Sequence, residues 1–305
     1  MAHNVEIVIF VLPHELPGLE KLIHRLRVGS MFLADTEPDL SWLSLRVIMG
    51  ISDEVVDWES STVSKQKVLQ DFEEIRSEVD WIPRTFLATS EINGCTSARR
   101  YASLVSEADA FIWLDTDIVA SPRTLGGLVH SYTSLLELGY ETFVITPQTV
   151  RLWDITWDCL VHPKFLNEPL GYQRTNDIYL DVQRCNSDPV ELVGPISAGV
   201  AGQPRMKFAG GWFTLITSAL LKKVPIPNSF SHYGLEDTYI MWGCEVLRNP
   251  QFQQFLLQNC IVGEQYKNRQ DLIDSRIVLI DRRAEYKAIN EQQFSLELDK
   301  LRNTQ

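Results

Sequence analysis

The chain has 305 residues, enough for one large α/β domain or two small ones. Apolar residues make up 45 % of it and charged residues 22 %, an ordinary globular composition with ample material for a core. The net charge of −12 disfavours a protein that coats nucleic acid, because an acidic surface repels phosphate.

Membrane insertion, export and zinc binding are not indicated either. The apolar run 7–12 is far shorter than a membrane span, and residues 1–4 lack the basic flank of a secretory signal. The five cysteines are widely spaced without a CxxC pair, which favours reduced, mostly buried thiols over structural zinc. We therefore expect a cytoplasmic protein without a transmembrane segment, whose oligomeric state stays open.

The first 117 residues alternate between strand and helix patterns. Apolar, β-rich runs predict strands over 5–12, 43–51, 85–88 and 110–114. Apolar residues at helical spacing predict helices over 19–26, 68–79 and 98–108. This alternation indicates an α/β fold with a mostly parallel central sheet flanked by helices on both faces.

The rest of the chain continues this pattern around one long interruption. It is expected to add helices over 122–138 and 234–247 and strands over 142–146, 206–217 and 261–262. Residues 150–204 have weak periodicity and indicate a long excursion, or a flap over the acceptor side of the site. We predict a single domain over 1–281 and a peripheral C-terminal helix or tail over 282–305.

Asp115 and Asp117 follow the most apolar of the predicted strands. Ligands of such sheets bind at the carboxyl ends of the strands, which is where this pair lies. Two carboxylates separated by one residue can both reach a hard divalent cation and a diphosphate bound to it. Taken alone, such a pair is equally consistent with a solvated turn after a strand.

The residues around this pair resemble a known family. Asn93-Gly94, then Ser97-Ala98-Arg99, a helix and the string FIWLDTDI of 111–118 are similar to the central signature of GT-A glycosyltransferases. These are DxD-containing, family-2-like members of the nucleotide-diphospho-sugar transferase superfamily. WLDTDI is also locally similar to metal-dependent mannosyltransferases of the fungal Golgi. The resemblance implies a Rossmann-like GT-A fold and transfer of a sugar from a UDP- or GDP-sugar to a hydroxyl of a glycan or other acceptor.

The resemblance also implies a metal site. Asp115 and Asp117 would bind Mn²⁺ or Mg²⁺, which holds the nucleotide. Many family members add a C-terminal histidine, but here no histidine follows His232. Glu264 would replace it as an oxygen ligand, or the metal is held only by the pair and the nucleotide. Lys267 would neutralise the leaving diphosphate as its charge develops.

A second landmark is the string FAGGWF of 208–213, followed by Glu236 and Asp237. In inverting members of the family a glycine-rich strand contacts the donor sugar, which implies this role for Gly210 and Gly211; a strand bulge is the alternative. An acceptor hydroxyl must lose a proton as it attacks, so a carboxylate must lie opposite the leaving diphosphate. The resemblance implies that Asp237 is this base and that Glu236 orients the acceptor or supports the base. Helix capping is the alternative.

Three further residues are expected to bind the donor. His14, after the first strand, and Asp53, after the second, occupy positions where the family grips the base and ribose. Glu54 and Asp57 compete with Asp53 for this role. Arg99 would lie within reach of the DxD pair or the diphosphate, and a surface arginine is the alternative.

Two other functions remain open. FIWLDTDIV also fits the motif of haloacid-dehalogenase-like phosphatases, with Asp115 as nucleophile and Asp117 as acid and base, although that family usually places the motif on its first strand. A non-catalytic sugar-nucleotide or glycan-binding module would need nearly the same residues. Replacing Asp237 with Asn separates these functions, because only an inverting transferase would lose turnover and keep donor binding.

Overall fold

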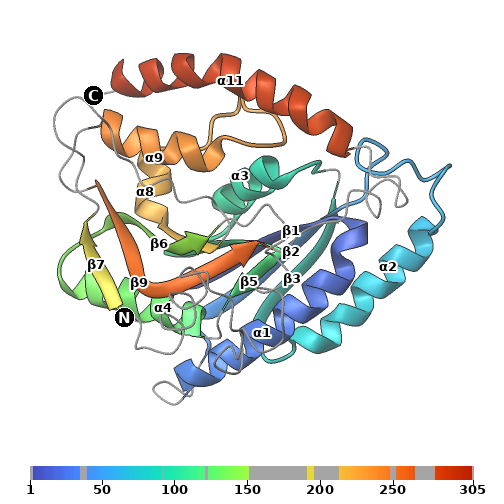
Figure 1. The fold of residues 1–305 in the computed structure, drawn as a ribbon, viewed down its shortest axis with the longest axis horizontal. Helices are drawn as coiled ribbons and strands as arrows, with labels where there is room; N and C mark the ends of the chain where they lie inside the picture. Colours follow the sequence, from blue (N-terminus) through green and yellow to red (C-terminus); the bar gives the residue numbers. More distant parts are fainter. Residues whose placement is uncertain are drawn as a thin grey trace, which may run out of the picture.

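A computed structural model of the chain describes residues 3–34, 40–90, 92–120, 123–150, 191–195, 213–247, 252–264 and 279–303. Figure 1 shows a central sheet with helices on both of its faces. The predicted fold class, an α/β protein with a mostly parallel sheet flanked by helices, is confirmed.

Within the described residues the sheet has nine strands. They are β1 (Val5–Val11), β2 (Leu43–Gly50), β3 (Arg84–Ser90), β4 (Ala110–Asp115), β5 (Ile118–Ala120), β6 (Thr142–Val150), β7 (Glu191–Pro195), β8 (Phe213–Thr217) and β9 (Phe252–Glu264). Their order is β3-β2-β1-β4-β8-β6-β9-β5, and β7 pairs with β9. Strands β1 to β4 are parallel, β8 is antiparallel to both of its neighbours, and β9 is parallel to β6. Six of the nine strands therefore share one direction.

The helices form two layers (Figure 1). One face of the sheet is covered by α1 (Leu16–Ala34), α2 (Lys65–Glu74) and α4 (Arg123–Glu137). The other face is covered by α3 (Cys95–Val105), α8 (Ser218–Lys223), α9 (Glu236–Val246) and α11 (Leu279–Asn303). Short 3-10 helices, η1 (Pro13–Glu15) and η2 (Ile75–Val79), flank α1 and α2. Among the described helices, none combines the length and the apolar run that a membrane span needs.

The central strands are apolar throughout because both of their faces are covered. Along β4, Ile112 and Leu114 pack in the cluster under α1, α2 and α4, whereas Phe111 and Trp113 pack in the cluster under α8, α9 and α11. Successive side chains of a strand point to opposite faces, so a strand covered twice has no solvent side. This explains why the strand appears in the sequence as a continuous apolar run.

The structure extends some of the predicted elements and corrects one. The predicted strand 261–262 is the end of the longer β9. The excursion 150–204 lies outside the described residues apart from Val150, which ends β6, and 191–195, which form β7. The helix predicted over 282–305 is present as α11 but is not peripheral, because Tyr286, Leu298 and Leu301 are buried against the rest of the fold. The predicted boundary at 281 falls inside this helix.

The packing of α9 can be tested at Gly243. A Cβ atom there would lie 2.3 Å from Cγ1 of Val224 and 3.2 Å from Cδ2 of Leu301. We expect Gly243→Ala to lower the free energy of unfolding by about 1–3 kcal/mol, because overpacking forces neighbouring groups apart. Gly18→Ala in α1 is the matched control. Its Cβ would meet only the carbonyl oxygen of Thr116, at 3.5 Å, and alanine favours the helix by roughly 0.5–1 kcal/mol.

Urea denaturation of both variants measures the difference. Equal stability of the two would contradict the close packing of α9 against its neighbours.

Candidate active site

Arg99 lies at the centre of the site, at the carboxyl end of β4. It sits in the second turn of α3 and is only 5 % exposed. One end of its guanidinium donates to Oδ1 of Asp115 at 2.7 Å, and the other donates to Oε1 of Glu236 at 2.5 Å. The guanidinium also lies over the ring of Trp113, 5.1 Å from its centroid. One buried cation therefore joins the DxD pair to the acidic pair of α9.

The charges of this cluster support one another. Burial alone would lower the pKa of Arg99, but Asp115 and Glu236 raise it, and the net shift is upward. Burial, followed by the nearby Glu236, raises the pKa of the Cys95 thiol. Arg99 therefore stays charged, and Cys95 stays protonated and is not poised as a thiolate nucleophile.

Glu236 is held from several sides at the start of α9. It is 2 % exposed, its Oε2 accepts from the hydroxyl of Thr96 at 2.6 Å, and its Oε1 lies 3.7 Å from Sγ of Cys95. The positive end of the α9 dipole adds to this stabilisation of the anion. A carboxylate so enclosed is poorly placed to receive a proton from an incoming acceptor. The geometry suits the supporting role expected for Glu236 better than that of the base.

The turn before α9 has an uncommon backbone. Gly234 and Leu235 have φ values of +87° and +69°, and the second is unfavourable for a residue with a side chain. Asn290 of α11, fully buried, holds this turn. Its amide donates to the carbonyls of Tyr233 and Gly234 at 3.0 and 2.7 Å, and its Oδ1 accepts from the N–H of Ser231 at 2.5 Å. The strained turn therefore depends on the C-terminal helix.

The same turn is attached to α3. Nδ1 of His232 lies 3.1 Å from Oγ of Ser97, and its carbonyl accepts from the N–H of Thr96 at 3.1 Å. A Cβ on Gly94 would lie only 2.2 Å from that carbonyl oxygen, so glycine is what permits the close approach. Asp237 is half-buried, and its Oδ1 accepts from the N–H of Thr238 at 2.6 Å. Asp237 is thus the second residue of α9, next to Glu236.

The structure places the two DxD carboxylates together at the sheet edge. Asp115 ends β4 with a side chain that is 32 % exposed, and Asp117 lies half-buried in the turn to β5. No three His, Cys, Asp or Glu side chains within the described ranges gather in a way that would hold a metal ion. Glu264 ends β9, but its side chain, like Gly210, Gly211 and Lys267, lies outside what the structure describes.

The loop after β2 carries the acidic residues predicted to bind the base and ribose. Asp53 is exposed and forms no hydrogen bond or ion pair with a described residue, so its binding of the nucleotide stays a prediction. Its neighbour Glu54 accepts from Nδ2 of Asn93 at 2.7 Å and lies 3.4 Å from the hydroxyl of Tyr286. These contacts connect Glu54 to the start of α3 and to α11.

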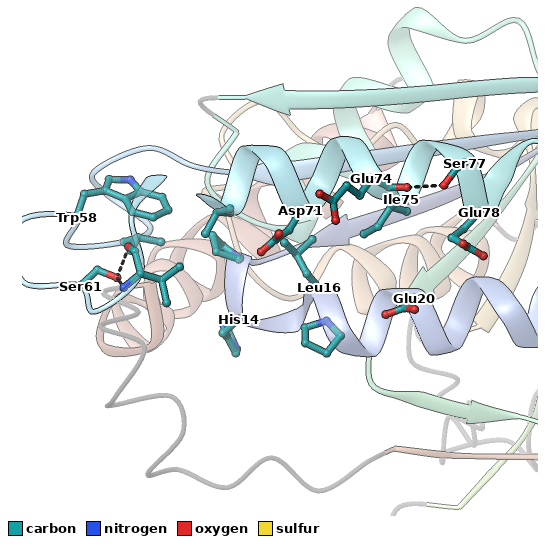
Figure 2. A pocket seen from close by; sticks show the side chains of 15 residues that line it. His14, Leu16, Glu20, Trp58, Ser61, Asp71, Glu74, Ile75, Ser77 and Glu78 are labelled. Carbon is teal, nitrogen blue, oxygen red and sulfur yellow. Dashed lines mark hydrogen bonds between the residues drawn. The ribbon is translucent and has the colours of Figure 1, made fainter. Parts of the chain in front are cut away.

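A cavity of about 750 Å³ lies between α1, α2 and the loop after β2 (Figure 2). His14 and Trp58 line it, whereas Asp115, Asp117, Glu236 and Asp237 do not. Several carboxylates also line it, namely Glu20, Asp71, Glu74 and Glu78. Such walls repel anions, so the cavity is poorly suited to a diphosphate. The binding of a nucleotide by His14 stays a prediction.

Sequence reasoning missed two residues of this site. Thr96 is a helix residue whose role appears only through its contact with Glu236. Asn290 lies on α11, whose polar composition gave no signal that the helix packs against the turn before α9. The string of adjacent arginines at 282–283 was the one local sign that could have drawn attention to that segment.

No family model and no curated protein matches this sequence. Among solved structures, the chain is similar to the crystal structure of GalNAc-T7 with UDP, GalNAc and Mn²⁺, at 14 % identity and a TM-score of 0.49, over 87 % of this chain and 44 % of that one. It is also similar to the crystal structure of S. aureus TarS 1-349 in complex with UDP-GlcNAc, at 12 % identity and a TM-score of 0.47, over 87 % of this chain and 60 % of that one. The chain thus spans less than half the length of the GalNAc-T7 chain.

The contribution of the central cation can be measured with Arg99→Met. This variant leaves Asp115 and Glu236 without their cation, and removing one partner of a buried ion pair typically costs about 3–5 kcal/mol. We expect a loss of this order in the free energy of unfolding, measured in urea. The double variant Arg99→Met, Glu236→Gln should regain part of it, because it also removes the most buried anion. A single variant as stable as the wild type would contradict this assignment.

The pH dependence of stability can be tested at His232. Burial lowers the pKa of His232, and Arg100 lowers it further against the opposing charge of Glu54. Below about pH 6.5, His232 of the unfolded chain binds a proton more readily than His232 of the folded chain. The free energy of unfolding therefore decreases as the pH falls below this value. We expect unfolding free energies between pH 7.5 and 5.5 to fall more steeply for the wild type than for His232→Asn, which does not titrate. Parallel curves would disprove this.

Proposed function

We propose that the protein is a glycosyltransferase of GT-A architecture that transfers a sugar, with inversion, from a nucleoside-diphosphate sugar to an acceptor hydroxyl. The observation that carries the proposal is the contact of Arg99 with both Asp115 and Glu236. Two motifs that separately resemble parts of the family signature form one cluster at the carboxyl ends of the parallel strands. That edge is where sheets of this kind bind ligands.

The DxD carboxylates suit a hard divalent cation. Mg²⁺ and similar ions are commonly bound by one or two carboxylates together with substrate phosphates, so a third protein ligand is not required. Asp115 and Asp117 would hold the ion, with Glu264 as a further proposed ligand. When bound, Mn²⁺ or Mg²⁺ would neutralise negative charge on the diphosphate of the donor.

In the proposed reaction, Asp237 accepts the proton of the acceptor hydroxyl as the hydroxyl oxygen bonds to the anomeric carbon of the sugar. The bond between that carbon and the diphosphate oxygen breaks on the opposite side, which inverts the configuration. Glu236 stays ionised between Arg99 and Thr96 and positions its neighbour Asp237. Asn290 maintains the turn from which both carboxylates emerge.

The phosphatase alternative is disfavoured by two observations. The Asp115 motif follows the fourth strand rather than the first, and β1, β2 and β3 precede it in the chain. Its Oδ1 is also bound by Arg99, which stabilises the carboxylate and lowers its reactivity as a nucleophile.

Titration calorimetry tests the proposal, with UDP and with GDP as probes, each with and without Mn²⁺. We expect one of the two nucleotides to bind in a metal-dependent way. Asp117→Asn should weaken this binding at least tenfold, about 1.4 kcal/mol, because a carboxylate ligand is lost. Asp299→Asn, an exposed carboxylate of α11, is the matched control and should bind normally. Failure of both nucleotides to bind to the folded wild type would overturn the proposal.

Turnover distinguishes an enzyme from a binding module. With the matching nucleotide sugar, release of the nucleoside diphosphate should fall roughly 10²–10⁴-fold in Asp237→Asn, because general base catalysis contributes about this much. Nucleotide binding should be retained. Unchanged turnover in this variant would exclude Asp237 as the base.

A further inference from the structure

Arg283 lies near the start of α11 and contacts the turn before α9. Its guanidinium lies 4.7 Å from the centroid of the Tyr233 ring, in the turn before α9. The charges of Glu15, after β1, and of Asp117, after β4, act on it. Burial alone would lower the pKa of Arg283, but Tyr233 and these carboxylates raise it, and the net shift is upward. Arg283 therefore stays charged, and the start of α11 lies near the end of β1, where Tyr286 packs with Leu12.

Besides its contact with the Tyr233 ring, this cation lacks the ion pairs that Arg46 and Arg99 have. The Nε atom of Arg283 is buried and has no hydrogen-bond partner in the described part of the chain, where no carboxylate forms an ion pair with the guanidinium either. By contrast, Arg46 pairs with Glu6 at 2.6 Å, and Arg99 pairs with two carboxylates. A buried charged donor without a partner is costly, and a native structure that retains one calls for an explanation.

An anionic ligand explains this arrangement. The planar fork of a guanidinium matches the oxygens of phosphate groups, which it binds through paired N–H donors. Arg99 is not available for this purpose, because Asp115 and Glu236 already balance its charge. Asp117, the proposed metal ligand, is close enough to Arg283 for its negative charge to raise the pKa of the guanidinium. The guanidinium of Arg283 is therefore close to the proposed metal ligand Asp117 and forms no ion pair of its own within the described residues.

We infer that Arg283 binds the diphosphate of the nucleotide donor, so that the C-terminal helix forms part of the donor site. The inference rests on the proposed function. Tyr286 and Asn290 fix the position of Arg283, since both are buried residues of the same helix that contact Glu54 and the 231–234 turn. The helix thus supplies both the anion-binding group and the anchor that orients it.

The test compares Arg283→Gln and Arg283→Lys with the wild type and with Arg302→Gln, an exposed arginine of the same helix. Calorimetry with Mn²⁺ measures the affinity for UDP, GDP, the two nucleosides and inorganic pyrophosphate. We expect Arg283→Gln to bind the matching nucleoside diphosphate and pyrophosphate at least tenfold more weakly, with the affinity for the nucleoside unchanged. Arg283→Lys should be intermediate, because it keeps the charge and loses the fork. Arg302→Gln should resemble the wild type.

Thermal unfolding without ligand provides a second measurement. A purely structural arginine would lower the melting temperature when replaced, whereas loss of an unpaired buried charge should leave it unchanged or raise it. Normal diphosphate affinity in Arg283→Gln, or an equal loss for diphosphate and nucleoside, would overturn the inference while the proposed function stands. Failure of the wild type to bind either nucleotide would overturn both.

Discussion

The ion pairs of Arg99 determine how the elements around the site are arranged. Asp115 and Glu236 would repel one another at the sheet edge without a cation between them, and a buried carboxylate that has no cation is costly. The guanidinium joins the end of β4, the second turn of α3 and the first turn of α9. None of these three elements can shift alone without exposing or isolating a charge. Asp117 lies two residues after Asp115, and Asp237 directly follows Glu236. The positions of both therefore follow from this constraint.

A second constraint acts on the side of the acceptor. The turn at Gly234 and Leu235 is unfavourable as a free segment, and it exists because buried hydrogen bonds from Asn290 offset its strain. The donor of those bonds comes from the last helix of the chain. Completion of the site therefore requires that α11 be docked, so that folding of the C-terminal segment and assembly of the acidic pair are coupled.

The predictability of these features depends on whether their cause is local in sequence. The strands from β1 to β4 are covered on both faces and appear as apolar runs, and the edge rule then places Asp115 and Asp117 at the site before any chemistry is considered. The position of α11 could not be predicted in this way, because its buried residues are sparse along a polar helix. Thr96 and Asn290 act through single contacts with distant residues, and such contacts leave no periodic pattern. The proposed roles of the remaining predicted residues stay predictions.

The overall charge of −12 and the local charges of the site have different consequences. A surface acidic enough to repel a nucleic-acid backbone also repels a nucleotide sugar, unless fixed cations act at short range, where screening by solvent and salt is weak. The carboxylates around the cavity between α1 and α2 would keep a diphosphate out of that region. On the opposite layer, Arg99 forms two ion pairs, whereas Arg283 forms none with the described residues. In a protein of this charge, the role proposed for Arg283 would place an anionic substrate at the part of the sheet edge that lies beside α11.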